Sequence, residues 1–355
     1  MFVAGYHISG WALNGYSLLP HQPWATAGAA ENAIGRFLLM LFPGHAALMM
    51  FFAISGCVLY VSLQYGPQTF GPAAVRFFVA RIFRIYPIVF FGVLFAAWVQ
   101  GWHSTIHPQT ANHPLGASEI VANMLLLQAT VNSTLWALQL EAVMAPIILL
   151  LYFLDRAYGP WALLALGVVT TALTFSNWAV WPPLSINMYA FILGMLIPTL
   201  GRQWASSLSR RAANWWMLGA VIAMFAAGPL FGFYSRFTGV FETYAALALL
   251  SLAAYRSDIR GSGLLESWPM RQLGVSSGSY YVLHIPLLAL FMAAAAMVVP
   301  AAWSAQAPLL VGAAVVTVAL VAIAPICLLS YHLVEAQGIA LGRRVIQSRR
   351  VVAAE

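Results

Sequence analysis

Long apolar stretches constrain this chain more than any other feature of its sequence. An apolar run of about 20 residues is the length of a helix that crosses a bilayer. Ten such runs follow one another, roughly at 1–18, 38–63, 85–102, 134–154, 160–178, 184–200, 214–231, 238–255, 276–298 and 307–333. The 355 residues are 62% hydrophobic and 7% charged, with a mean hydropathy of +0.84, which excludes a soluble domain. We predict an all-α integral membrane protein, a bundle of about ten transmembrane helices in one domain.

The 16 basic residues are all arginine, and they fall on alternate connections between these runs. Fourteen lie on one side of the expected bundle, and only Arg36 and Arg236 lie on the other. Because basic residues gather on the cytoplasmic side of a membrane, we predict that both chain termini are cytoplasmic. A net charge of +7 often indicates nucleic acid, but no basic run is interleaved with aromatic residues, so no nucleic-acid partner is expected. Cys57 and Cys327 lie in apolar runs and are read as buried thiols.

The connection over 103–133 is read as an outer loop with a short amphipathic helix near 118–129. His103, His107 and His113 lie in it, and the first two have the spacing of a zinc pair on a helix. Pro108 follows directly, however, and Glu119 is the nearest carboxylate. We expect no metal site here, and two separate histidines elsewhere do not make a haem site.

Ionisable residues inside the apolar runs are the candidates for chemistry, since a charge at the bilayer centre costs about 2.5 kcal/mol or more. His7 lies in the first run, and its imidazole either bonds to a neighbouring helix or takes part in catalysis or proton transfer. Glu141 lies in the first half of the fourth run and should face the bundle interior. It is either part of a structural ion pair or catalytic, and it could orient His7, as could the hydroxyl of Ser55.

Arg81 and Arg84 are three residues apart and share one face of a helix that enters the membrane. Two guanidinium groups at the mouth of a bundle form a fork suited to phosphate, although the same pair could simply anchor the helix. Towards the C-terminus, His284, His332 and Glu335 are further polar groups, for which packing is the favoured interpretation.

Six ordered motifs resemble the acyltransferase-3 family, the multi-span membrane enzymes that O-acylate cell-surface carbohydrates. They cover nearly the whole chain: VAGYHIS at 3–9, FFAISGCVL at 51–59, FFVARIFRIYP at 77–87, TLWALQLEAVMAP at 134–146, GVSSGSYYVLHIPLL at 274–288 and SYHLVEAQGIALGRR at 330–344. Each motif alone is weak, but their order and coverage make the resemblance specific.

The resemblance implies that an acyl group, expected to be acetyl, moves from cytoplasmic acyl-CoA to a hydroxyl of a glycan acceptor. It assigns the catalytic position to His7, the basic pair that holds the donor to Arg81 and Arg84, and the acidic position to Glu141. It implies acyl-CoA (acetyl-CoA) as the donor substrate without a permanently bound cofactor, and a multi-pass location in the bacterial inner membrane. Histidine suits this role because its ordinary pKa, about 6.5, lets it act as a general base near neutrality.

Two departures from the family pattern leave alternatives open. The family carries an arginine about ten residues before its histidine, and here only six residues precede His7. We expect a membrane domain over 1–345 and a cytoplasmic tail over 346–355. The short N-terminus has two alternative readings: the start codon lies further upstream, or the chain is truncated and is an inactive relative of the enzyme. Gln337 also replaces a usual proline. A proton-coupled permease, with His7, Glu141 and His284 as its relay, is the alternative from another class.

Overall fold

The computed structural model describes residues 40, 43–106, 115–176, 178, 181–232, 235–300 and 308–352, with backbone only at 103–106, 292, 296, 308–313, 316 and 349–352. Within these ranges the chain is helical and contains no strand, which confirms the all-α prediction. Eight of the helices are long and apolar enough to cross a membrane. The protein is therefore a multi-pass membrane protein in its architecture.

The helices follow one another in this order: α3 (Gly44–Gln64), α4 (Phe70–Ile106), α5 (Ala117–Met124), α6 (Leu135–Tyr158), α7 (Pro160–Leu173), α8 (Pro182–Gly194), the π-helix η3 (Ile197–Gly201), α9 (Arg202–Ser207), α10 (Arg210–Phe231), α11 (Arg236–Tyr255), α12 (Ser262–Leu265), α13 (Trp268–Val275), α14 (Ser277–Val298), α16 (Pro308–Ser330), the π-helix η4 (Tyr331–Glu335) and α17 (Ala336–Val352). The last three form one kinked rod, and α17 continues across residue 345, where we placed the start of the tail.

The count of ten spans is not confirmed. The run at 160–178 forms α7, whose 14 residues extend about 21 Å and fall short of a bilayer core of about 30 Å. The run at 1–18 lies outside the described residues. The other eight runs correspond to the eight long helices, because each supplies enough consecutive apolar residues to reach across.

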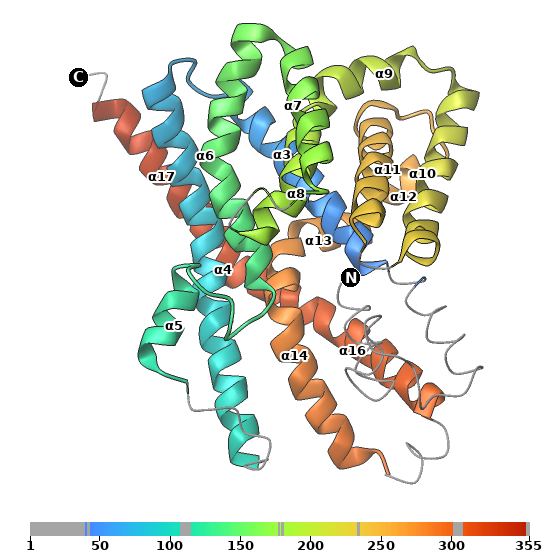
Figure 1. Cartoon of the computed structure of the whole chain (residues 1–355). Coiled ribbons are helices and arrows are strands. Elements are labelled where there is room, and N and C mark those ends of the chain that lie inside the picture. Colours follow the sequence, from blue (N-terminus) through green and yellow to red (C-terminus); the bar gives the residue numbers. More distant parts are fainter. Residues whose placement is uncertain are drawn as a thin grey trace.

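Helix α4 differs from the expected span at 85–102, because it begins fifteen residues earlier, at Phe70. Its arginines therefore lie within the helix and do not precede it. Figure 1 shows α4 running through the whole height of the molecule, with α17 beside its upper part and α14 beside its lower part. Pro87 lies inside α4, where it removes one backbone hydrogen bond. Two glycines of α17, Gly338 and Gly342, allow that helix to approach closely at Pro87 and Phe83.

Helices α3 and α8 cross at reciprocal glycines. A side chain at Gly56 of α3 would overlap the backbone carbonyl of Phe191, and one at Gly194 of α8 would overlap the backbone of Ala53. Small residues at such crossings let two helix backbones touch, which is a usual way to pack helices in lipid. The crossing fixes α3, which carries Ser55 next to Gly56, against the bundle core.

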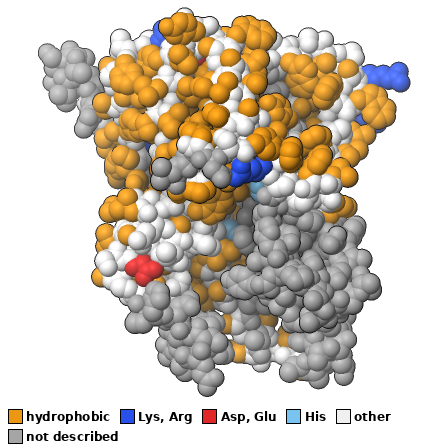
Figure 2. Space-filling view, viewed as in Figure 1, with side chains coloured by type: hydrophobic (Ala, Val, Ile, Leu, Met, Phe, Trp, Pro, Cys, Tyr) orange, Lys and Arg blue, Asp and Glu red, His pale blue; other side chains and the backbone are white. Residues whose placement is uncertain are grey.

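The outer surface of the helices is apolar. Large side chains such as Phe90, Leu94, Trp98, Leu150 and Trp161 are exposed, and Figure 2 shows orange apolar atoms over most of the upper part of one face. An apolar surface of this extent marks contact with lipid.

The short helix α5 confirms the amphipathic helix expected near 118–129. The side chain of Asn123 in α5 accepts a hydrogen bond from the backbone N–H of Val131, which holds the loop that follows the helix.

Candidate functional site

Helix α4 brings Arg81 to the carboxylate of Glu141 on α6. Nη2 of Arg81 lies 2.8 Å from Oε1 of Glu141, and both residues are buried, with 7% and 9% of their surfaces exposed. The hydroxyl of Ser55 on α3 donates to the same carboxylate oxygen at 3.1 Å. Three helices therefore meet at one oxygen atom. The two side chains that could orient His7 contact each other, and whether either reaches His7 stays a prediction.

The donors of Arg81 are not all used. Its Nε and Nη2 atoms are buried, and neither is aligned with an acceptor among the described residues, although Nη2 is close to Glu141. The attraction between the two side chains is therefore carried by charge more than by a well-directed hydrogen bond. A buried guanidinium with spare N–H groups can accept a further oxygen atom from a ligand.

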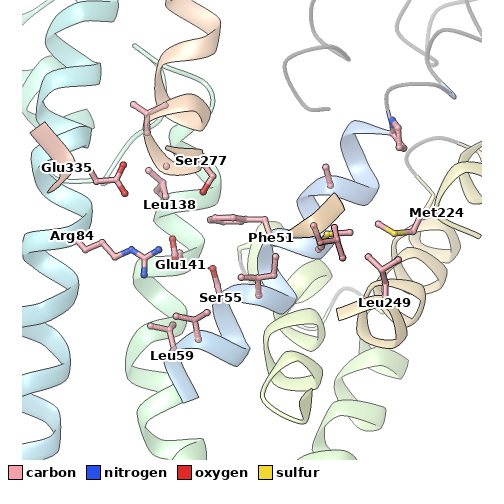
Figure 3. A pocket seen from close by; sticks show the side chains of 18 of the residues that line it. Phe51, Ser55, Leu59, Arg84, Leu138, Glu141, Met224, Leu249, Ser277 and Glu335 are labelled. Atoms are coloured by element: carbon pink, nitrogen blue, oxygen red, sulfur yellow. Dashed lines mark hydrogen bonds between the residues drawn. The ribbon is translucent and has the colours of Figure 1, made fainter. Parts of the chain in front are cut away.

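Arg84, one helical turn from Arg81, is exposed and forms no ion pair within the described ranges. Figure 3 shows its guanidinium group pointing from α4 into a cavity. The two arginines thus differ: Arg81 is held by Glu141, whereas Arg84 is exposed and interacts with Glu335 only at longer range, so it can also bind an anion from outside the chain.

Glu335 lines the same cavity as Arg84 and Glu141. It ends η4, and its Oε2 accepts from the backbone N–H of Ser279 at 3.1 Å and from the Ser279 hydroxyl at 3.0 Å. Because these groups lie in the first turn of α14, the carboxylate caps that helix from a distant part of the chain. Gly278 makes room for it, since a Cβ there would lie 2.9 Å from Oε1. This agrees with the structural role favoured for Glu335.

These side chains line a cavity of about 710 Å³. Ser55, Arg81, Arg84, Glu141, Ser277 and Glu335 form one polar end, where α3, α4, α6, α14 and η4 meet. The rest of the wall is largely apolar. It comes from α3, α10, α11 and α12, with further apolar side chains from α4, α6 and α14. Figure 3 shows this separation, with Arg84, Glu141 and Glu335 on one side of Phe51 and Met224 and Leu249 on the other. A volume of this size suits a small organic ligand.

Arg260 adds a third cation to the cavity wall, from the turn between α11 and α12. The turn is held firmly: the backbone N–H of Arg260 donates to the Asn214 side chain, and Arg256 grips Asp258 through two hydrogen bonds of 2.7 Å. The hydrogen bond from Arg256 lowers the pKa of the Asp258 carboxyl below its ordinary value. Gly261 then turns the chain with φ +91°, a value that favours glycine.

The remaining predicted residues do not join this cluster. His284 is buried in α14, and its Nδ1 donates to the backbone oxygen of Tyr281 at 2.7 Å, so that nitrogen carries the proton. His332 is exposed on η4. Neither lines the cavity that holds Glu141, which gives the permease relay no support.

Several of the predicted histidines lie outside the residues that the structure describes. His7, His107 and His113 lie beyond the described residues, and the His103 side chain is not described. Among the described residues, no three His, Cys, Asp or Glu side chains are grouped closely enough to hold a metal ion. The roles assigned to His7, Glu141, Arg81 and Arg84 therefore stay predictions.

The structure also contains a pair that the sequence reasoning missed. Nδ1 of His45, at the start of α3, lies 2.5 Å from Oε2 of Glu242 in α11, and Glu242 is buried. Gly239 faces the same ring, since a Cβ there would lie 3.2 Å from Cε1 of His45. A signal was available, because Glu242 is a lone carboxylate inside an apolar run.

Comparison with known proteins agrees with this architecture. The sequence profile of one family, described as an acyltransferase domain, matches residues 1–329, which is most of the chain. A search of curated proteins and a search of solved structures gave no match. By the extent of the profile match, this chain belongs to the acyltransferase-3 family.

Proposed function

We propose that this protein is a membrane O-acyltransferase that moves an acyl group from cytoplasmic acyl-CoA to a hydroxyl of a cell-surface carbohydrate. Family membership supports acyl transfer within a multi-pass membrane protein. The observation that carries the proposal further is the polar end of the cavity, where guanidinium N–H groups remain without an acceptor among the described residues. Arg84 has no ion pair among the described side chains, and the buried Nε of Arg81 has no acceptor there.

The donor fits this end by charge. Coenzyme A carries phosphate oxygens, and guanidinium groups bind phosphate through paired, charge-assisted hydrogen bonds. Arg84 and Arg260 offer exposed guanidinium groups on the cavity wall. Arg81, fixed by Glu141, can donate to a carbonyl oxygen of the same ligand. We therefore assign phosphate binding to the exposed arginines and the acyl carbonyl to Arg81.

In the proposed reaction the acceptor hydroxyl oxygen attacks the thioester carbon. A C–O bond forms, the C–S bond breaks, and the hydroxyl proton passes through a base to the departing thiolate, which leaves as coenzyme A thiol. A base is needed because the pKa of an alcohol is far above neutrality. The motif VAGYHIS assigns this role to His7. Glu141 keeps Arg81 in place and acts as a positioning residue.

Membranes that contain the full-length protein, incubated with labelled acyl-CoA and envelope glycan, test the proposal. Wild-type membranes should transfer label, and His7→Gln should abolish transfer at unchanged protein level. Arg84→Ala should raise the KM for the donor by about ten- to a hundred-fold, the value of one charged hydrogen bond. Arg76→Ala is the matched control, because Arg76 lies on the same helix and bonds to the Tyr65 carbonyl outside the cavity.

Transfer by wild-type membranes that does not exceed that of membranes lacking the protein would refute the enzyme assignment. Full transfer by His7→Gln would refute the base. An unchanged donor KM in Arg84→Ala would leave this arginine as a topological anchor.

A further inference from the structure

We propose that the apolar end of the cavity holds the hydrocarbon chain of the donor, so that the preferred donor is a medium- or long-chain acyl-CoA and not acetyl-CoA. The inference rests on the proposed function. It starts from one cavity whose wall is polar around Arg81 and Arg84, where α3, α4, α6, α14 and η4 meet, and largely apolar between α3, α10 and α11. Figure 3 shows Arg84, Glu141 and Glu335 apart from Met224 and Leu249.

Three large apolar side chains that line the cavity are partly exposed. Ile54 and Val58 on α3 are 39% and 42% exposed, and Val221 on α10 is 37% exposed, although all three line the cavity. Met217 and Leu249 complete the facing wall. Apolar surface that faces a cavity is most favourable when hydrocarbon covers it.

The extent of the apolar wall exceeds what an acetyl group needs. Cavity-lining residues run from Pro43, which precedes α3, along one face of the helix to Leu59, and the part before Ser55 alone is about 18 Å along the helix axis. The methyl of an acetyl group bound at Arg81 and Ser55 would touch only the beginning of this wall. A chain of many methylenes would cover it.

Two other ligands could supply hydrocarbon: a bilayer lipid and the lipid tail of a carrier-linked acceptor. The charge at the polar end favours the donor. An acyl-CoA places its carbonyl next to the apolar chain and its phosphates further along the same molecule. Arg81, at the polar end of the cavity, suits the carbonyl, and the exposed Arg84 one helical turn away suits a phosphate. The experiment separates these ligands.

The test measures kcat/KM for acetyl-, octanoyl- and dodecanoyl-CoA with the full-length protein in membranes, from release of coenzyme A thiol and from label on the glycan. Each methylene buried against an apolar wall is worth about four-fold in affinity. We expect dodecanoyl-CoA to exceed acetyl-CoA by at least about ten-fold, allowing for incomplete burial. Val221→Trp should reduce this ratio towards one, and Ile54→Trp should do the same from the opposite wall.

Leu218→Trp is the matched control. Leu218 lies one turn before Val221 on α10 and is exposed, but it does not line the cavity, so the chain-length ratio should not change. A preference for acetyl-CoA that Val221→Trp leaves unchanged would overturn the inference while the proposed function stands. The inference would also be overturned if Val221→Trp changed the selectivity for the lipid tail of the acceptor and left the chain-length preference for the donor unaltered. If the protein consumed no acyl-CoA of any chain length, both this inference and the proposed function would be overturned.

Discussion

The ion pair between Arg81 and Glu141 offers the sharpest test of how the site is held together. Two opposite unit charges 2.8 Å apart attract by about 6 kcal/mol at an effective dielectric constant of 20. Desolvation of two buried groups offsets much of this attraction. Removing one partner leaves the other buried and unpaired, which costs about 3–5 kcal/mol, whereas replacing both with apolar side chains costs far less. We therefore expect Arg81→Met and Glu141→Leu each to lower the free energy of unfolding by about 3–5 kcal/mol.

In a double-mutant cycle, the variant with both Arg81→Met and Glu141→Leu should be more stable, by about 2 kcal/mol or more, than the sum of the two single losses implies. The hydrogen bond from Ser55 is lost in both variants that change Glu141, so its free energy cancels in this cycle. Equilibrium unfolding of the purified protein in mixed micelles, followed through its 13 tryptophans, gives the four free energies. Arg84→Met is the control, since Arg84 is exposed on the same helix and should cost no more than about 0.5 kcal/mol. Strictly additive losses would show that the two charges do not depend on each other.

Two further predictions concern packing and pH. Gly56→Ala and Gly194→Ala should each lower the free energy of unfolding by about 3 kcal/mol or more in the same assay, because the added methyl meets backbone that cannot move away. Gly219→Ala is the control, since its Cβ would meet no described atom within 4 Å and should not destabilise the protein, and equal behaviour of all three variants would rule out a close crossing of α3 and α8. Because Arg256 lowers the pKa of Asp258 in the fold, the contribution of Asp258 to stability is complete above its unfolded pKa of about 3.9 and is lost as pH falls through the lower folded value. The difference in Tm between wild type and Asp258→Asn should therefore shrink below about pH 4, and a constant difference from pH 7 to pH 3 would contradict this linkage.

The helices and the charged residues at the polar end of the cavity could be predicted from the sequence, and the lipid environment is the reason for both. Lipid leaves a chain little choice but to form long apolar helices, and it makes a buried charge such as Glu141 find a partner. The partner of Glu141 is Arg81, which lies on another helix, α4. The motif FFVARIFRIYP had already singled out Arg81 and Arg84 as candidate site residues.

Features that depend on how helices pack could not be predicted in this way. His45 and Glu242 are 197 residues apart in the chain, and hydropathy does not say which helix faces make contact. The same applies to Glu335, whose contact with Ser279 depends on a π-turn that no residue pattern announced. The count of ten spans is not confirmed at α7, since apolar character over 160–178 does not reveal that the helix ends at Leu173.

The wide turn η4 has a consequence for how chains of this kind can diverge. A π-turn accommodates one residue more than an α-turn, so loss of a single codon within 331–335 would restore regular helix and rotate α17 by about 100° relative to α16. Gly338 and Gly342 would then turn away from Phe83 and Pro87, and bulkier neighbours would meet α4 in their place. A homologue that lacks the extra residue must carry its paired glycines at shifted positions, so insertions, deletions and small residues in this region should change together.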